Sequence, residues 1–176
     1  MANNYRPDNK LIGTAGMYYT AYILTRRGMV VVPKDDDLRR TGLVVSSRDR
    51  RRCVQIQVKT SFNFATGFWP ICPAKRFLEG DEVYDYYALI RPRRTDHTGL
   101  DEMAEFEGFM LTAEEAQKEM KAHFDYKTTE GRELKFAVSV FVDKRNREQA
   151  WPEVGQGKWE KNRELWRKRW QTWTLN

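Results

Sequence analysis

The part of the sequence best suited to chemistry is residues 53–61, which read Cys-Val-Gln-Ile-Gln-Val-Lys-Thr-Ser. Apolar residues occupy every second position from 54 to 58, a period of two that is typical of a strand with one buried face. Gln57 and Lys59 should therefore project side by side from the other face. The amide carbonyl of Gln57 is an acceptor and Lys59 carries an ammonium group, and both stand on a rigid strand. We interpret the fold as one that presents this polar pair.

Three elements are expected before this strand, namely a helix over residues 10–27 and strands over 29–33 and 43–47. Aromatic and aliphatic residues recur at helical spacing through the first of them, and Gly28 stands where that helix should end. Gly13 and Gly16 near its start would let another element approach closely. Arg48 to Arg52 is expected to be the turn of an antiparallel hairpin that leads into Cys53.

The rest of the chain is expected to complete the same α/β domain, with residues 62–77 as an aromatic loop. Further elements are predicted as strands over 83–90, 106–111 and 135–142 and helices over 112–124 and 158–172. Thr112 and Glu115 have the spacing of a helix capping box. The order indicates one domain over residues 1–176, with a central mixed sheet and an N-terminal arm at 1–9.

With the helix, the hairpin and Gln57-Val58-Lys59 in this order, the chain resembles the PD-(D/E)XK nuclease superfamily, specifically its small restriction-endonuclease-like members. The matching segments are Gly16, Arg26–Gly28, Gly42–Val45 and Gln57–Ser61. The likeness extends more loosely to the second half, including a Trp-bearing C-terminal segment. It implies a restriction-endonuclease-like core, in which a mixed sheet is flanked by helices.

The resemblance also implies phosphodiester hydrolysis with Mg²⁺, in which Lys59 would be the catalytic lysine and Gln57 a catalytic residue and metal ligand. The sequence departs from the family where two carboxylates are expected, because Met17 and Gly42 stand there. A carboxylate is usual among the oxygen ligands of Mg²⁺. The candidates to replace the missing metal ligand are Asp35, Asp36 and Asp37, five to seven residues before Gly42. A solvated acidic turn is the alternative interpretation of these three residues.

Basic charge suggests a DNA partner, since the formal net charge is +6 and the pI is about 9.3. The excess is concentrated in two segments, because residues 48–52 carry +3 and residues 144–169 hold nine Lys or Arg against four Glu. Clustered basic charge favours a polyanion. The predicted nucleic-acid-binding residues are Arg48, Arg50, Arg51, Arg52, Lys161, Arg167 and Lys168. Solvated surfaces on an ordinary protein are the alternative.

The last predicted helix, part of a basic Trp-rich segment at 158–173, carries four tryptophans on one face. Trp159, Trp166, Trp170 and Trp173 are offset by 7, 11 and 14 residues. They are expected to pack against the core, although they could also stack nucleobases. A homodimer or a protein partner docked through this helix is a further expectation.

Other classes of protein fit less well. No apolar run approaches the roughly 20 residues of a membrane span, and no secretory h-region begins the chain. Cys53 and Cys72 lack metal spacing, so reduced thiols and a cytoplasmic location are expected. His97 and His123 form no zinc motif, and no phosphate-binding glycine loop follows a strand.

Two functions therefore stand beside each other on the same fold. The first is a Mg²⁺-dependent endonuclease that hydrolyses phosphodiester bonds of DNA. The second is a catalytically inactive nuclease-like protein that binds nucleic acid or another protein in a phage, mobile-element or defence system. A structural subunit of a larger assembly, docked through the tryptophan helix, is a third interpretation.

Overall fold

The strand that carries Gln57 lies at the centre of a five-stranded mixed sheet. The computed structural model describes residues 9–34, 42–61, 68–73, 84–92, 106–119, 135–139 and 156–175, with side chains at 10–34, 42–61, 84–91, 106–119 and 162–175. Its elements are α1 (Asn9–Arg26), β1 (Val30–Lys34), β2 (Gly42–Ser46), β3 (Cys53–Thr60), β4 (Phe68–Pro73), β5 (Tyr86–Pro92), β6 (Phe106–Thr112), β7 (Lys135–Ser139) and α5 (Gln156–Thr172). Residues 113–119 are also helical.

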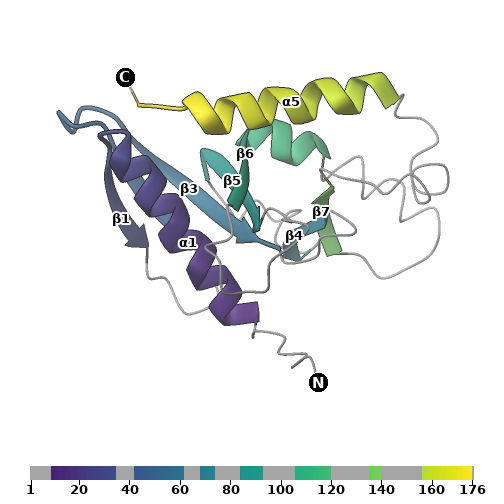
Figure 1. Cartoon of the computed structure of the whole chain (residues 1–176), viewed down its shortest axis with the longest axis horizontal. Coiled ribbons are helices and arrows are strands. Elements are labelled where there is room, and N and C mark those ends of the chain that lie inside the picture. The colour runs from purple at the N-terminus through teal and green to yellow at the C-terminus, as the bar shows by residue number, and fades with distance from the viewer. Residues whose placement is uncertain are drawn as a thin grey trace, which may run out of the picture.

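The strand order of the large sheet is β1-β2-β3-β5-β6, and β4 and β7 form a second sheet of two strands (Figure 1). β1, β2 and β3 are antiparallel neighbours, as the predicted hairpin requires. β5 then runs parallel to β3, and β6 runs antiparallel to β5. The protein is therefore an α/β protein whose mixed sheet is flanked by helices.

The first helix ends as the sequence predicts and packs tightly on β3. Gly28 has φ of +84°, a left-handed conformation that suits glycine, and its N–H donates to the carbonyl of Thr25. A Cβ added at Gly16 would lie 2.8 Å from the Cβ of Thr60. Glycine at position 16 therefore allows the helix and the strand to approach each other more closely than any larger residue would permit.

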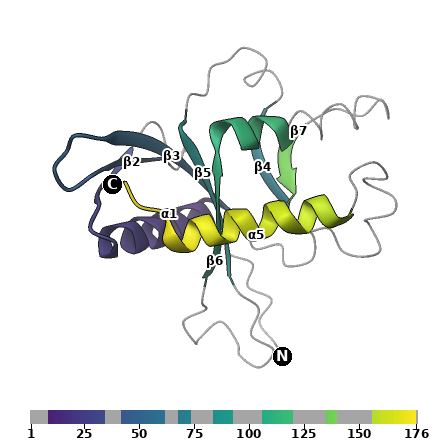
Figure 2. The same cartoon turned by 90° about the horizontal axis from the view of Figure 1, so that it is seen from above.

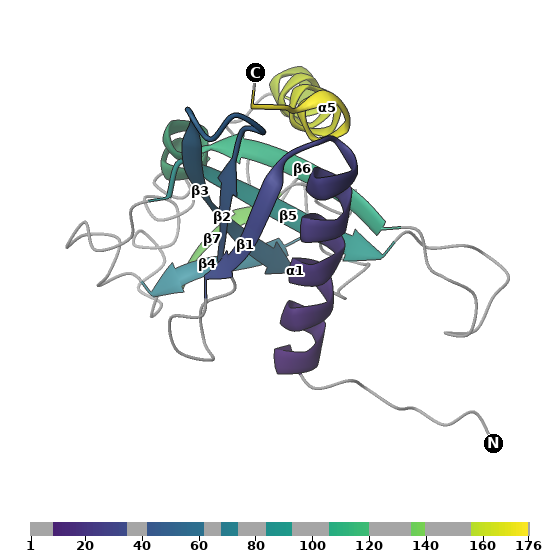
Figure 3. The same ribbon diagram turned by 90° about the vertical axis from the view of Figure 1, so that its left-hand side faces the viewer.

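Both long helices cover the same face of the sheet. One core cluster joins Leu24 of α1, Val58 of β3, Met110 of β6 and Trp170 of α5. Val58, Ala88 and Met110 are in register across three strands, so they share this face. Figure 2 and Figure 3 show α1 meeting the C-terminal half of α5.

The tryptophans of α5 face the sheet rather than solvent. Trp166, Trp170 and Trp173 are buried, which confirms the packing interpretation for these three. The side chain of Trp159 lies outside the described residues. Gly108 of β6 leaves room for the indole of Trp170. The ring of Tyr19 of α1 stacks on the same indole and so joins α1 to α5.

Ion pairs hold α5 on β6 and on the segment that follows it. Glu107 accepts hydrogen bonds from the guanidinium groups of Arg91 and Arg167. Burial alone would raise the pKa of Glu107, but the hydrogen bonds and charges of these two arginines outweigh it and lower the pKa. Glu115 is bound in the same way by Arg169. Arginine side chains on α5 are thus structural as well as basic.

Most of the predicted elements are confirmed, and one is wrong. Residues 68–73, expected in a loop, form β4, which pairs with β7 through an irregular register between Pro70 and Cys72. Pro70 and Pro73 stand within this strand, and a strand of a two-stranded sheet has a free side where a missing N–H is tolerated. Thr112 and Glu115 form the predicted reciprocal capping bonds. The predicted arm lies, up to residue 8, outside the described residues.

Candidate functional site

A transverse row of side chains crosses the sheet at Gln57, on the face opposite α1 and α5. Lys34 of β1 is in register with Gly42 of β2, and Gly42 with Gln57 of β3. Gln57 is in turn in register with Tyr87 of β5. Opposed residues share a face, so the sheet brings these four positions together from four different strands.

Gln57 is buried rather than presented to solvent. Its exposed fraction is 1%, whereas the alternation of β3 predicted an open polar face. The prediction fails because neighbouring strands place Tyr87, Leu89 and Leu111 on that same face, and all three are buried. Among the described residues, no hydrogen-bond partner reaches the Oε1 atom of Gln57. A buried acceptor without a partner is costly and therefore marks a candidate ligand position.

Lys59 lies two residues further along the same face and is half-buried. Its register partners are Leu89 of β5 and, through it, Phe109 of β6. The predicted pairing of Gln57 and Lys59 on one face is thus confirmed by the strand geometry. β3 therefore places an ammonium group on the same face as the buried amide.

The ring of Tyr84 lies in front of Gly42, the position at which the resemblance led us to expect a carboxylate. A Cβ added at Gly42 would be 3.5 Å from Cε1 of Tyr84 and 3.6 Å from its hydroxyl oxygen, which is ordinary contact. Tyr84 is buried. No pattern in the sequence links residues 42 and 84, because their proximity arises only from the parallel pairing of β3 and β5.

Met17 does not lie beside Gln57. It packs, half-buried, against the core cluster that contains Val58. Because Val58 and Gln57 are adjacent on β3, their side chains point to opposite faces of the sheet. The helix position therefore contributes a packing side chain on the face away from the row.

The described residues do not fit a divalent-metal site. Mg²⁺ requires oxygen ligands, usually with at least one carboxylate. Within the described parts of the chain, no three His, Cys, Asp or Glu side chains come close enough to hold a metal ion. Gln57 offers a single neutral oxygen, Lys34 stands in the same row, and Lys59 lies two residues further along β3. Asp35, Asp36 and Asp37, the predicted metal ligands, lie outside the described residues.

A polar group around Gln55 borders the row on the side of the hairpin and shares Lys34 with it. Lys34 donates from Nζ to Oε1 of Gln55 over 3.2 Å, and the carboxylate of Asp85 accepts from the backbone N–H of Gln55 over 2.7 Å. Sequence reasoning singled out neither Lys34 nor Asp85. The alternation of β3 predicts that Gln55 shares the face of Gln57, and this was the only available signal.

The turn between β2 and β3 presents the predicted arginines to solvent. Arg48, Arg50, Arg51 and Arg52 are all exposed, and Arg50 has a positive φ of 59°. Ser47 donates from its hydroxyl to Asp49 over 2.6 Å, and the N–H of Arg51 donates to the same carboxylate oxygen. These bonds lower the pKa of Asp49. The one acid of the turn thus organises the backbone on which the arginines stand.

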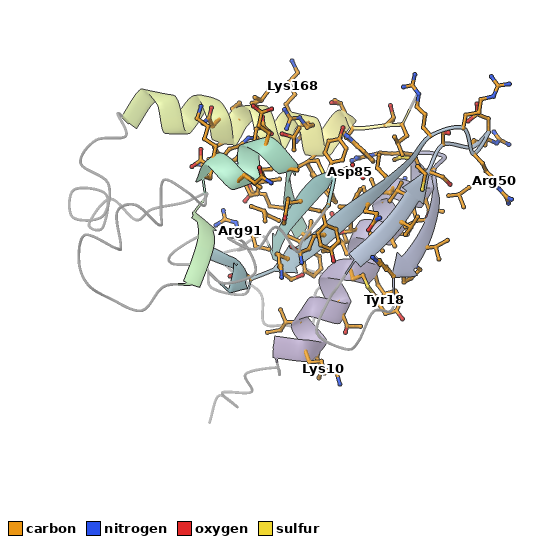
Figure 4. All side chains as sticks on the ribbon, turned by 180° about the vertical axis from the view of Figure 1, so that it is seen from behind. Lys10, Tyr18, Arg50, Asp85, Arg91 and Lys168 are labelled. Carbon is orange, nitrogen blue, oxygen red and sulfur yellow. The ribbon has the colours of Figure 1, made fainter. Side chains whose placement is uncertain are left out.

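The predicted basic residues of α5 are divided between structure and surface. Arg167 is bound to Glu107 and also lies over the ring of Phe109. Lys168 is exposed and points away from the molecule (Figure 4). The side chain of Lys161 lies outside the described residues. Of the basic residues predicted on α5, Lys168 is therefore the one that the described structure presents to a partner.

No protein-family model matches the sequence, and searches among curated proteins and solved structures find no match either. In the described part of the chain, no helix is both long enough and apolar enough to cross a membrane.

Proposed function

We propose that this protein binds DNA with the arginine turn between β2 and β3. The observation that carries the proposal is the exposure of Arg48, Arg50, Arg51 and Arg52 around the single acid Asp49. Asp49 already accepts hydrogen bonds from Ser47 and from the backbone of the turn. Its carboxylate is exposed as well, so it neutralises the neighbouring guanidinium groups only weakly.

A guanidinium group pairs well with phosphate because its N–H donors form a planar fork. Four such groups on one tight turn suit a polyanion more closely than a single acidic residue on a partner protein. Each phosphate neutralised by Lys or Arg contributes about −0.9 to the slope of log affinity against log salt. Binding by this turn should therefore weaken steeply as salt increases.

We also propose that the fold is restriction-endonuclease-like, and the order of the elements supports this part of the proposal. A helix precedes an antiparallel β1-β2-β3 unit, and a parallel strand β5 follows on the far side of β3. This arrangement agrees with the resemblance carried by Gly16, Arg26–Gly28 and Gln57–Ser61. Fold alone does not define function, so the arginine turn and not the topology is the basis for DNA as the partner.

The experiment measures binding of a fluorescent DNA duplex by anisotropy at about 50 and about 200 mM salt. The variant Arg51→Glu/Arg52→Glu should lose at least tenfold in affinity and show a shallower salt slope. Lys118→Glu is the matched control, because Lys118 is equally exposed but lies on the helical segment after β6. Equal affinity of wild type and the arginine variant would refute the role of the turn.

A second candidate is a metal-dependent nuclease, favoured by the unpartnered Oε1 of Gln57 beside Lys59. The described residues contain no group of three His, Cys, Asp or Glu side chains that could hold a metal ion, so the candidate requires one of Asp35, Asp36 or Asp37 there. Purified protein should then cut plasmid DNA in Mg²⁺ or Mn²⁺, and Lys59→Ala should abolish cutting. Binding without any cutting, on linear, supercoiled and branched DNA, would reject this candidate and leave the first intact.

A further inference from the structure

The outer face of α1 exposes a stripe of large apolar side chains, although both ends of the helix are basic. Leu11 is 57% exposed, Tyr18 62% and Tyr22 55%. Their spacings of 7 and 4 residues place all three on one side of the helix. The other face of α1 packs on the sheet through Leu24 and Gly16. The stripe is therefore separate from the core and from the row at Gln57.

The charged residues of α1 itself are all basic. The sequence of α1 contains no Asp or Glu, while Lys10 stands near its start and Arg26 at its end. The guanidinium of Arg26 lies 5.6 Å from the ring centre of Tyr22 and donates to its hydroxyl over 3.3 Å. An aromatic ring with a cation beside it and no acid on its helix is suited to an anionic ligand that also has flat rings.

The stripe continues toward the arginine turn. β1 begins directly after α1, and its first residue, Val30, is in register with Ser46 at the start of that turn. Arg26 and the exposed arginines of residues 48–52 therefore lie at the same end of the molecule. Figure 4 shows Lys10, Tyr18 and Arg50 following one another along this side.

We propose that Tyr18 and Tyr22 form a stacking surface for the unpaired bases of single-stranded DNA, whose backbone continues to the arginine turn. This inference rests on the proposed function and adds the form of the substrate. Tyrosine rings stack on base faces that become accessible only when a base is unpaired. Four helical residues separate the two rings by about 6 Å along the axis. That exceeds the roughly 3.4 Å between stacked bases of a duplex strand, so the rings suit an extended strand.

A second copy of the chain is a poorer occupant of this face. A two-fold contact through α1 would place the same surface against itself. Arg26 would then approach a basic surface with no acidic residue of the helix to compensate it. A nucleic acid strand supplies the missing negative charge along with the ring faces.

The test compares binding of a labelled oligothymidylate with that of a duplex of equal length, at one salt concentration. Wild type should prefer the single strand, and Tyr18→Ala/Tyr22→Ala should weaken single-strand binding about tenfold or more. The same variant should change duplex binding less than about twofold. Tyr18→Phe/Tyr22→Phe keeps both rings and should retain wild-type affinity. Leu165→Ala, at an exposed apolar side chain of α5, is the matched control and should change nothing.

If Tyr18→Ala/Tyr22→Ala binds single-stranded DNA as tightly as wild type, the stacking surface is wrong. The role of the arginine turn is unaffected by that result if Arg51→Glu/Arg52→Glu abolishes binding. Full retention of affinity in Tyr18→Leu/Tyr22→Leu would also overturn the stacking surface, because the stripe would then act only as an apolar surface. Light scattering tests for a dimer. If wild type is a dimer and the alanine variant is a monomer with the same DNA affinity, this face binds a second copy and the stacking proposal is wrong. Failure of wild type to bind either DNA form would reject both proposals.

Discussion

Replacement of Gly108 by alanine should destabilise the protein through a single contact between β6 and α5. A Cβ built at Gly108 would lie 2.5 Å from Cδ2 and Nε1 of Trp170, and closer still to Cε2. To restore a contact of 3.4 Å from 2.5 Å, the indole must retreat by at least 0.9 Å. Trp170 is 5% exposed, so its ring is already enclosed by the core cluster.

The surroundings of Trp170 determine the cost of that retreat. The guanidinium of Arg27 lies 5.6 Å from its ring centre and donates to its backbone carbonyl, and Tyr19 stacks on it at 6.4 Å. A shift of the indole therefore disturbs the junction between α1 and α5 as well as β6. Overpacking of a core costs about 1–3 kcal/mol. Alanine in place of glycine offsets about 0.4–1 kcal/mol of this cost by restricting the unfolded chain, so the midpoints of the two ranges leave a net loss of roughly 1.3 kcal/mol.

Urea unfolding followed by tryptophan fluorescence measures this change, together with a fall in melting temperature of about 2–4 °C per kcal/mol. Gly42→Ala is the matched control, since it adds the same methyl group in a strand with only ordinary contacts. Trp170→Phe should reduce the cost of Gly108→Ala in a double-mutant cycle, because the smaller ring leaves space for the new methyl group. If Gly108→Ala is as stable as wild type, the packing of α5 on β6 described above is wrong.

Two further predictions concern the attachment of the helices. Gly16→Ala should destabilise the protein by about 1–3 kcal/mol in urea unfolding, despite the better helix propensity of alanine. The reason is that the new Cβ would lie 2.8 Å from the Cβ of Thr60. A variant more stable than wild type would contradict this contact. Glu107→Gln should lower the free energy of unfolding at pH 7 by about 1–3 kcal/mol. The pKa of Glu107 is lowered from 4.5, so its stabilisation is complete above pH 4.5 and is lost as pH falls through the lowered pKa. The difference between wild type and Glu107→Gln in the free energy of unfolding should therefore narrow as pH falls below 4.5, and a difference independent of pH would refute the charge-based account.

Features that depend on neighbouring residues were predictable from the sequence. The alternation of residues 53–60 predicted β3, and the polar run at 48–52 predicted its turn. Gly28 and the Thr112–Glu115 pair marked a helix end and a helix start that the hydrogen bonds confirm. Each of these signals acts over a few residues, so no knowledge of distant contacts was needed.

Features that depend on distant pairing were not predictable. Residues 68–73 look like a loop until β7 supplies their hydrogen-bond partners. Arg167 counts as surface charge in the sequence, yet Glu107, sixty residues earlier, binds it. The opposite faces of Met17 and Gln57 follow from how α1 lies on the sheet, which helical periodicity alone does not specify.

The sequence by itself determined that Gln57 and Lys59 share one face of a strand and that arginines crowd the turn before it. Only the tertiary structure decided that Gln57 is buried, that Tyr84 lies in front of Gly42 and that Tyr18 and Tyr22 of α1 remain outside. The physical reason is that side-chain direction along a strand or helix is a local property of the backbone. Burial and proximity depend instead on which strands become neighbours, and those contacts join residues far apart in the chain.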